Sequence, residues 1–148
     1  GKSDPYVKIC SDPPALFRDA SSSKISPSTR PILATLNPSW SKVPDLLVGC
    51  ADRAQLKLCH IILAVLDYDT HSADDPMGYA ILPLRDFLDT EAAPKSFSQE
   101  LLCHSRAGPD GNGAGTISGN IQVLWPRDGQ RPAGSSVGVR SNGCCVLS

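Results

Sequence analysis

The segment that follows the most apolar stretch of the chain carries four carboxylates within nine positions. Asp67, Asp69, Asp74 and Asp75 lie in the run LDYDTHSADD, residues 66–75. Carboxylates this close repel one another, so a folded protein tolerates them only where solvent or a cation offsets their charge. Calcium takes about six to eight hard oxygen ligands in a flexible shell. Three of the four acids, Asp67, Asp69 and Asp75, therefore predict a calcium site at a loop tip, with a solvated acidic turn as the alternative.

The end of the sequence carries a second chemical signal. Cys145, Val146, Leu147 and Ser148 form a cysteine, two aliphatic residues and a terminal serine, which reads as a prenylation box that favours farnesyl. A prenyltransferase is the modifying enzyme that this implies. Cys144 is a candidate for palmitoylation, with an unmodified spacer cysteine as the alternative. One lipid chain holds a protein only marginally at a membrane, so a second attachment is expected.

Composition narrows the class of protein. The 148 residues are 41% hydrophobic and 20% charged, enough for one globular core plus a tail. A net charge of −1 provides no basic field to attract nucleic acid. No apolar run is long enough to span a bilayer. Any attraction to a membrane must then come from a local group of residues, from a bound ion or from a covalently attached lipid.

The six cysteines do not resemble a zinc site. They show no C-x-x-C spacing and no histidine partner. Cys10, Cys59 and Cys103 lie in or beside predicted strands, so we expect buried, reduced thiols rather than disulfides.

Short alternating segments with irregular links predict an antiparallel β-sandwich. Residues 84–88 predict one helical turn, and residues 11–31 predict a long loop rich in serine and proline. In the segment 56–66, Ile61, Leu63 and Val65 share one face of the predicted strand. Asp67 and Asp69 continue the same alternation beyond its end. The predicted strands span residues 6–10, 32–35, 43–48, 56–66, 79–83, 96–103 and 117–125.

The sequence predicts two regions. Residues 1–125 form the all-β domain, and residues 126–148, rich in Gly, Pro, Ser and Arg, form a disordered tail with the prenylation motif. The chain opens on Gly1 without a methionine, so a fragment or truncated gene product is expected.

Five segments in order resemble C2 domains, the calcium and lipid modules of protein kinase C and the synaptotagmins. They cover about residues 1–125. The segments are GKSDPYVKI (1–9), LNPSW (36–40), VLDYD (65–69), DPMG (75–78) and GNIQVLW (119–125).

This resemblance implies a Greek-key sandwich of eight strands with calcium-binding loops at one end. By position it implies calcium ligands at Asp4, Asp67, Asp69 and Asp75, with the Tyr68 carbonyl as a further oxygen. At Asp74 the family is variable, so a solvated charge is expected there.

The chain also departs from the family pattern. A second acid of the first loop, about six residues before Asp4, falls before Gly1, and the first strand falls there too. Fewer or weaker calcium ions and an exposed sheet edge are the expected consequences.

The predicted function is calcium-dependent binding to anionic phospholipid, with farnesyl as a lipid anchor. The predicted location is the cytoplasm and the cytoplasmic face of a membrane, the plasma membrane above all. The predicted process is signalling or membrane trafficking. The tip residues His71, Ala73, Pro76 and Met77 are expected to touch the headgroups. None is a large apolar wedge, so salt-sensitive binding is expected. The alternative is a lipid-anchored adaptor whose domain binds a protein partner without calcium. No catalytic motif is present, so an enzyme is not expected.

Overall fold

The computed structural model describes residues 3–12, 27–44, 46–49, 53–102, 115–124, 136–140 and 145–147. Within them, nine strands, one short α-helix and one 3-10 turn are present. The elements are β1 (Pro5–Asp12), β2 (Ser39–Trp40), β3 (Leu46–Gly49), α1 (Arg53–Lys57), β4 (His60–Asp67), β5 (Asp75–Pro83), η2 (Leu84–Phe87), β6 (Lys95–Glu100), β7 (Thr116–Leu124), β8 (Ser136–Arg140) and β9 (Cys145–Leu147).

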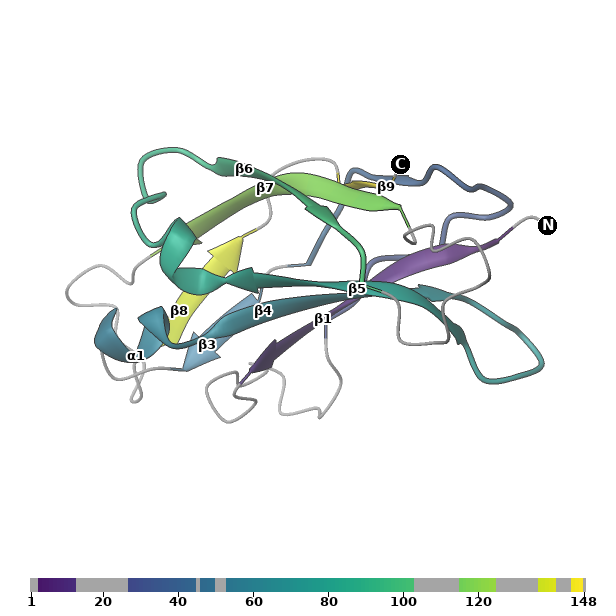
Figure 1. Ribbon diagram of the computed structural model, residues 1–148, viewed down its shortest axis with the longest axis horizontal. Helices are drawn as coiled ribbons and strands as arrows, with labels where there is room; N and C mark the ends of the chain where they lie inside the picture. Colours follow the sequence, from purple (N-terminus) through teal and green to yellow (C-terminus); the bar gives the residue numbers. More distant parts are fainter. Residues whose placement is uncertain are drawn as a thin grey trace.

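The strands form two layers, which confirms the predicted antiparallel β-sandwich (Figure 1). One sheet has the order β1-β4-β5. The other has the order β2-β9-β7-β8-β3, and β6 also pairs with β7. All of the strand pairings among the described residues are antiparallel.

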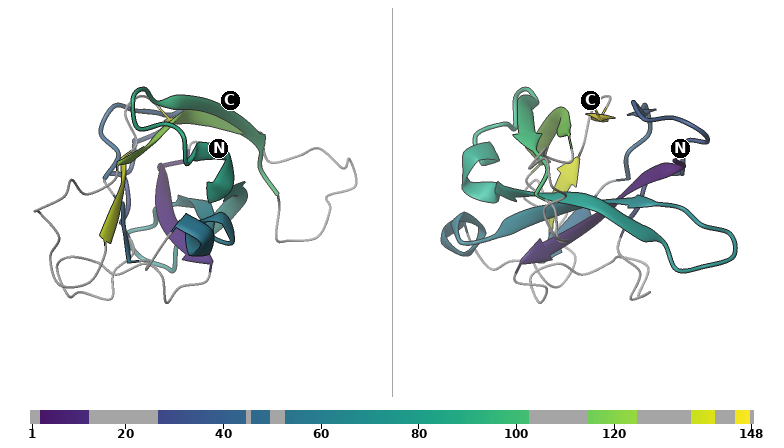
Figure 2. Two further views of the ribbon diagram at one scale, coloured as in Figure 1. Left: turned by 90° about the vertical axis from the view of Figure 1, so that its left-hand side faces the viewer. Right: turned by 45° about the vertical axis from the view of Figure 1, so that its right-hand side comes forward.

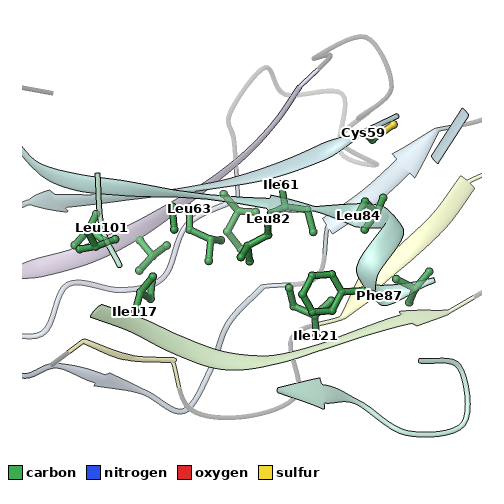
Figure 3. Close-up of a cluster of buried hydrophobic side chains, with 14 of the residues drawn as sticks. Cys59, Ile61, Leu63, Leu82, Leu84, Phe87, Leu101, Ile117 and Ile121 are labelled. Atoms are coloured by element: carbon green, nitrogen blue, oxygen red, sulfur yellow. The ribbon is translucent and has the colours of Figure 1, made fainter. Parts of the chain in front are cut away.

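Alternation of apolar residues builds the core between these layers. In β4, Ile61, Leu63 and Val65 are buried, while the residues between them are half-exposed. Ile117 and Ile121 of β7 face them from the other sheet (Figure 3). Because side chains alternate sides along a strand, one period-two pattern sets which face each sheet turns inward.

The helical elements lie at the end of the sandwich where β4 begins (Figure 1). The predicted strand over residues 56–66 is wrong at its start: Leu56 is the buried residue of α1, and β4 begins at His60. The helical turn at 84–88 is confirmed as η2. In the described part of the chain, no helix is both long and apolar enough to cross a bilayer.

Residues 32–35 were predicted to form a strand, and the structure places a turn there instead. Ala34 has a φ of 57°, in the left-handed region that no strand residue adopts. The backbone just before this turn runs beside β1, where Thr29 N–H donates to the Val7 carbonyl at 2.9 Å. That edge of β1 is therefore lined by the chain's own backbone.

The last part of the sequence differs from the predicted disordered tail. Within 126–148 the structure places β8 between β7 and β3, and β9 between β2 and β7. Val137 and Val139 of β8 supply a short alternating β-branched pattern within a Gly- and Ser-rich segment. The domain boundary at residue 125 stays a prediction, and Cys144 and Ser148 lie outside the described residues.

Two of the expected reduced thiols fall within the structure. Neither thiol is part of a disulfide; Cys59 is buried as predicted, whereas Cys10 is only half-buried. Burial raises the pKa of the Cys59 thiol, and the negative charge of Asp12 raises it further. A thiol held protonated in this way is a weak nucleophile, so Cys59 is a packing residue.

Core truncation at η2 tests this packing. Leu84 is fully buried, and its N–H donates to the Cys59 carbonyl at 2.9 Å. We expect Leu84→Ala to lower the free energy of unfolding by about 2–5 kcal/mol, because it leaves a cavity. Leu58→Ala, at a side chain 76% exposed, should change it by less than about 0.5 kcal/mol. Urea unfolding measures both, and equal effects would contradict the packing described here.

Candidate functional site

The pairing of β1, β4 and β5 places three of the predicted calcium ligands at the end of the sandwich opposite α1. Pro5 of β1 pairs with Asp67 at the end of β4, and Asp67 pairs with Asp75 at the start of β5. Asp4 directly precedes β1. Asp4 is 63 residues from Asp67 in the sequence. It nevertheless lies with Asp67 and Asp75 where the strands of one sheet begin or end.

Asp4 is the residue that joins the segments at this edge. Its backbone N–H donates to Asp67 Oδ1 at 2.6 Å, and its carbonyl accepts from the Tyr68 N–H at 3.1 Å. Its side-chain Oδ1 accepts from the Ala34 N–H at 2.7 Å. The start of β1, the turn around Ala34 and the loop after β4 are thus held together through one residue.

Asp69 and Tyr68 lie in the loop from residue 68 to 74 that joins β4 to β5. This loop extends from the sheet at the same end as the start of β1 (Figure 2). Both side chains are exposed, and Tyr68 is 42% exposed. A β-bulge between Val65 and Leu66 shifts the register just before the loop. Bulges of this kind re-aim side chains at sheet ends.

The chemistry of these donors fits calcium better than a transition metal. Carboxylate and carbonyl oxygens are hard ligands, and neither thiol nor imidazole is required for such a site. The side chains are not drawn together as in a filled site, however. Among the described residues, no group of three or more acidic, histidine or cysteine side chains is positioned to hold a metal ion. The Oδ1 atoms of Asp4 and Asp67 accept backbone N–H groups, while a carboxylate has a second oxygen for a ligand.

Asp74 is not the solvated charge that the family pattern predicts, because it has two hydrogen-bond donors. Its Oδ2 accepts the Tyr6 O–H at 2.6 Å, and its Oδ1 accepts the Asp69 N–H at 3.1 Å. The expected solvated charge is instead a half-buried link between β1 and the β4–β5 loop. No local pattern reveals this link, because Tyr6 and Asp74 are 68 residues apart and meet only through the pairing of β1 with β4.

This link shifts the ionisation of both partners. Burial above all, together with the hydrogen bond to Asp74 and the negative charge of that carboxylate, raises the pKa of Tyr6 to about 12. The hydrogen bond from Tyr6 is the largest cause that lowers the pKa of Asp74, followed by that from the Asp69 N–H. At neutral pH the link therefore joins a neutral phenol to a charged carboxylate.

The residues expected to touch lipid headgroups lie on or beside the same loop. His71, Ala73 and Pro76 are exposed. Met77 is half-buried and packs against the hydrophobic core. Three of the four side chains are thus presented to solvent at the acidic end, and Met77 is turned partly inward.

Tyr6→Phe tests the link between β1 and the loop. The change should remove the tyrosine that titrates near pH 12, as measured by ultraviolet absorbance between pH 9 and 13. Because the folded-state pKa of Tyr6 is raised from 10.0, its contribution to stability is complete below pH 10 and is lost as pH rises toward 12. Asp74→Asn should move the late titration to lower pH while burial keeps it above 10.0. An unchanged late titration in Tyr6→Phe would contradict the assignment.

Comparison with known proteins agrees with this architecture. The family model for the C2 domain matches residues 1–99. A solved C2 domain of a plant Extended Synaptotagmin 1 superposes with a TM-score of 0.50 at 17% identity, over 95% of this chain and 79% of that one. This likeness supports the fold.

Two curated proteins are similar in sequence. Protein unc-13 homolog D of Homo sapiens is 30% identical over 142 residues, which is 95% of this chain. Multiple C2 and transmembrane domain-containing protein of Drosophila melanogaster is 35% identical over 127 residues, which is 86% of this chain. The chain spans 12% of the length of each. The chain therefore belongs to the C2 domain family, whose members are in general non-catalytic modules that bind membrane phospholipid and commonly bind calcium.

Proposed function

We propose that this domain binds anionic phospholipid membranes in a calcium-dependent manner through the acidic end of the sandwich. The observation that supports the proposal most directly is the register of β1, β4 and β5, which brings Asp4, Asp67 and Asp75 to one sheet edge. Asp69 and the Tyr68 carbonyl, in the adjoining loop, complete the proposed ligand set.

The acids near η2, at the other end of the sandwich, are in a different electrostatic setting. Asp89 lies 3.9 Å from an Arg53 guanidinium nitrogen, and Asp86 lies 3.9 Å from Arg85 Nε. An arginine lies near each of these two acids, whereas the segment 67–75 contains no lysine or arginine, so the acidic loop is the more favourable place for a cation.

The negative charge of the loop residues makes the membrane affinity of the acidic end responsive to calcium. The segment 67–75 holds four aspartates and no lysine or arginine. Such a loop is repelled by the negative surface of a membrane that contains phosphatidylserine. Calcium, when bound, offsets carboxylate charge and leaves coordination places for lipid phosphate or carboxylate oxygens. The exposed His71, Ala73 and Pro76 then lie at the headgroup level.

We propose in addition that farnesyl at Cys145 makes the attachment persistent, with Cys144 as a palmitoylation candidate. The residues 145–148 support this as a prenylation box, on the condition that translation ends at Ser148. In the structure, β9 pairs Cys145 and Val146 with β2, and Val146 and Leu147 with β7. Modification by a prenyltransferase therefore requires that β9 leaves both of these partners. The location that follows is the cytoplasmic face of a membrane, the plasma membrane above all.

A second function has an observation in its favour. The described residues contain no cluster of three side chains positioned for a metal ion, and Asp4 and Asp67 each already accept a backbone N–H. A domain that does not bind calcium under cellular conditions would act as a lipid-anchored adaptor for a protein partner. Calcium affinity in solution distinguishes the two functions.

Asp67→Asn combined with Asp69→Asn tests the proposed ligands. Asparagine keeps the oxygen that accepts the Asp4 N–H while removing the charge. We expect at least about a tenfold loss of calcium affinity by calorimetry, because affinity follows ligand charge. The matched control is Asp86→Asn with Asp89→Asn, which removes two charges at the η2 end. Wild-type affinity in the first double variant would argue against this site.

Cys145→Ser tests the lipid anchor. Without the thiol no thioether forms, so the protein should leave the membrane fraction of resting eukaryotic cells and become mainly soluble. Cys50→Ser is the matched control, because it removes a thiol and leaves both candidate lipidation sites, Cys144 and Cys145, intact. An unchanged membrane fraction for Cys145→Ser, measured by cell fractionation, would contradict farnesyl anchoring.

A further inference from the structure

The strands β8 and β9 lie end to end along β7. Arg140 of β8 pairs with Gln122 near the end of β7, and Val146 of β9 pairs with Ser118 near its start. Both pairings are antiparallel, so the chain runs in one direction along β7 from β8 to β9. The register along β7 shifts by two residues between the two strands, while the direction stays the same.

On their other side, the same two strands pair with β2 and β3 in a single register. Val139 of β8 pairs with Leu46 of β3, and Cys145 of β9 pairs with Trp40 of β2. Leu46 lies six residues after Trp40, and Val139 lies six residues before Cys145. The two pairings therefore belong to one antiparallel register. We call β8 and β9 together the terminal strand.

The terminal strand has a central place in its sheet. The sheet order β2-β9-β7-β8-β3 puts β7 on one side of it and β2 and β3 on the other (Figure 1). A central strand pairs its backbone on both sides, so its removal would leave two edges with unpaired N–H and C=O groups. The described part of this sheet is therefore complete only when the terminal strand is in place.

The terminal strand can leave while its neighbours stay folded. It has no pairing with the β1-β4-β5 sheet, and β7 remains paired with β6 along Thr116–Ile121. If translation ends at Ser148, as the prenylation box requires, the strand is tethered only through the residues that follow β7. Gly138 lies in the interior of β8, where glycine weakens a strand.

We propose that the terminal strand is a switch for lipidation: paired in the sheet, it withholds the prenylation box, and released from the sheet, it presents the box to a prenyltransferase. This inference rests on the farnesyl anchoring proposed above, because Cys145, Val146 and Leu147 belong both to β9 and to the box. In the reaction, Cys145 Sγ forms a thioether with the first carbon of farnesyl diphosphate. Pyrophosphate leaves, and the thiol proton passes to solvent.

The backbone of Val139 is the most direct place to break the pairing. Val139 is paired with Leu46 and with Val123. The Val123 N–H donates to Thr90 Oγ1 at 2.8 Å, so the backbone of Val123 is turned away from Val139. In an antiparallel ladder the N–H of Val139 then faces Leu46. A proline at position 139 removes this donor from a central strand, where proline is not tolerated.

Hydrogen exchange tests the pairing without any lipid. In the full chain, amides of both β8 and β9 should exchange slowly, as measured by mass spectrometry. Val139→Pro should release both strands together while amides of β4 stay protected. Gln130→Pro, which adds a proline outside the described strands, is the matched control. Fast exchange of β8 and β9 in the parent chain, or loss of protection confined to β8, would overturn the proposal.

Farnesylation in vitro, with purified farnesyltransferase and farnesyl diphosphate, tests the switch itself. Val139→Pro leaves the box unchanged and should react at least about tenfold faster than the parent chain. Gly138→Ala, which favours the strand, should react about two- to fivefold more slowly. This second variant decides the test if the proline variant does not fold. Equal rates in the parent and in the folded variants would contradict the switch.

A free peptide of residues 140–148 separates this inference from the farnesyl proposal. It carries the box without the domain and should react as fast as Val139→Pro. A reactive peptide, with equal rates among the folded proteins, would overturn the switch alone. An unreactive peptide would overturn farnesyl anchoring and the switch with it, even where hydrogen exchange shows the terminal strand in place.

Discussion

The antiparallel pairing of β4 with both β1 and β5 is the constraint on which the acidic end depends. These three strands bury one face against β7 and therefore cannot slip by one residue without turning their apolar side chains outward. The β1–β4 register that places Ile61, Leu63 and Val65 in the core also places Asp67 beside the residue that follows Asp4. On the other side of β4, the one-residue shift at the bulge between Val65 and Leu66 sets Asp67 opposite Asp75. The position of the carboxylates thus follows from core packing together with this bulge.

Gathering like charges at one edge has an electrostatic cost, and the structure shows how it is partly offset. Backbone N–H groups donate to Asp4, Asp67 and Asp74, and a phenol donates to Asp74. Hydrogen bonds to charged carboxylates are stronger than those between neutral groups. They also hold the start of β1, the turn around Ala34 and the loop after β4 together.

The alternation in β4, the helical turn at η2 and the family's motifs were readable from the sequence because each depends on neighbouring residues. The Tyr6–Asp74 link was not, because it depends on strand pairing across 68 residues. The turn at Ala34 was read as a strand since its apolar residues suit either structure, and its hydrogen-bond partners, among them the Asp4 carboxylate, are distant in sequence. The strands β8 and β9 were missed because their segment is dominated by Gly, Ser and Arg, and their pairing partners lie elsewhere in the fold.

Sedimentation of unlipidated protein with phosphatidylserine vesicles, in calcium and in chelator, tests the central claim most directly. The proposal that a membrane repels the acidic end without calcium and attracts it with calcium predicts that the protein pellets strongly with vesicles in calcium and weakly in chelator. Equal pelleting in the two conditions by folded protein would contradict a calcium-gated membrane site.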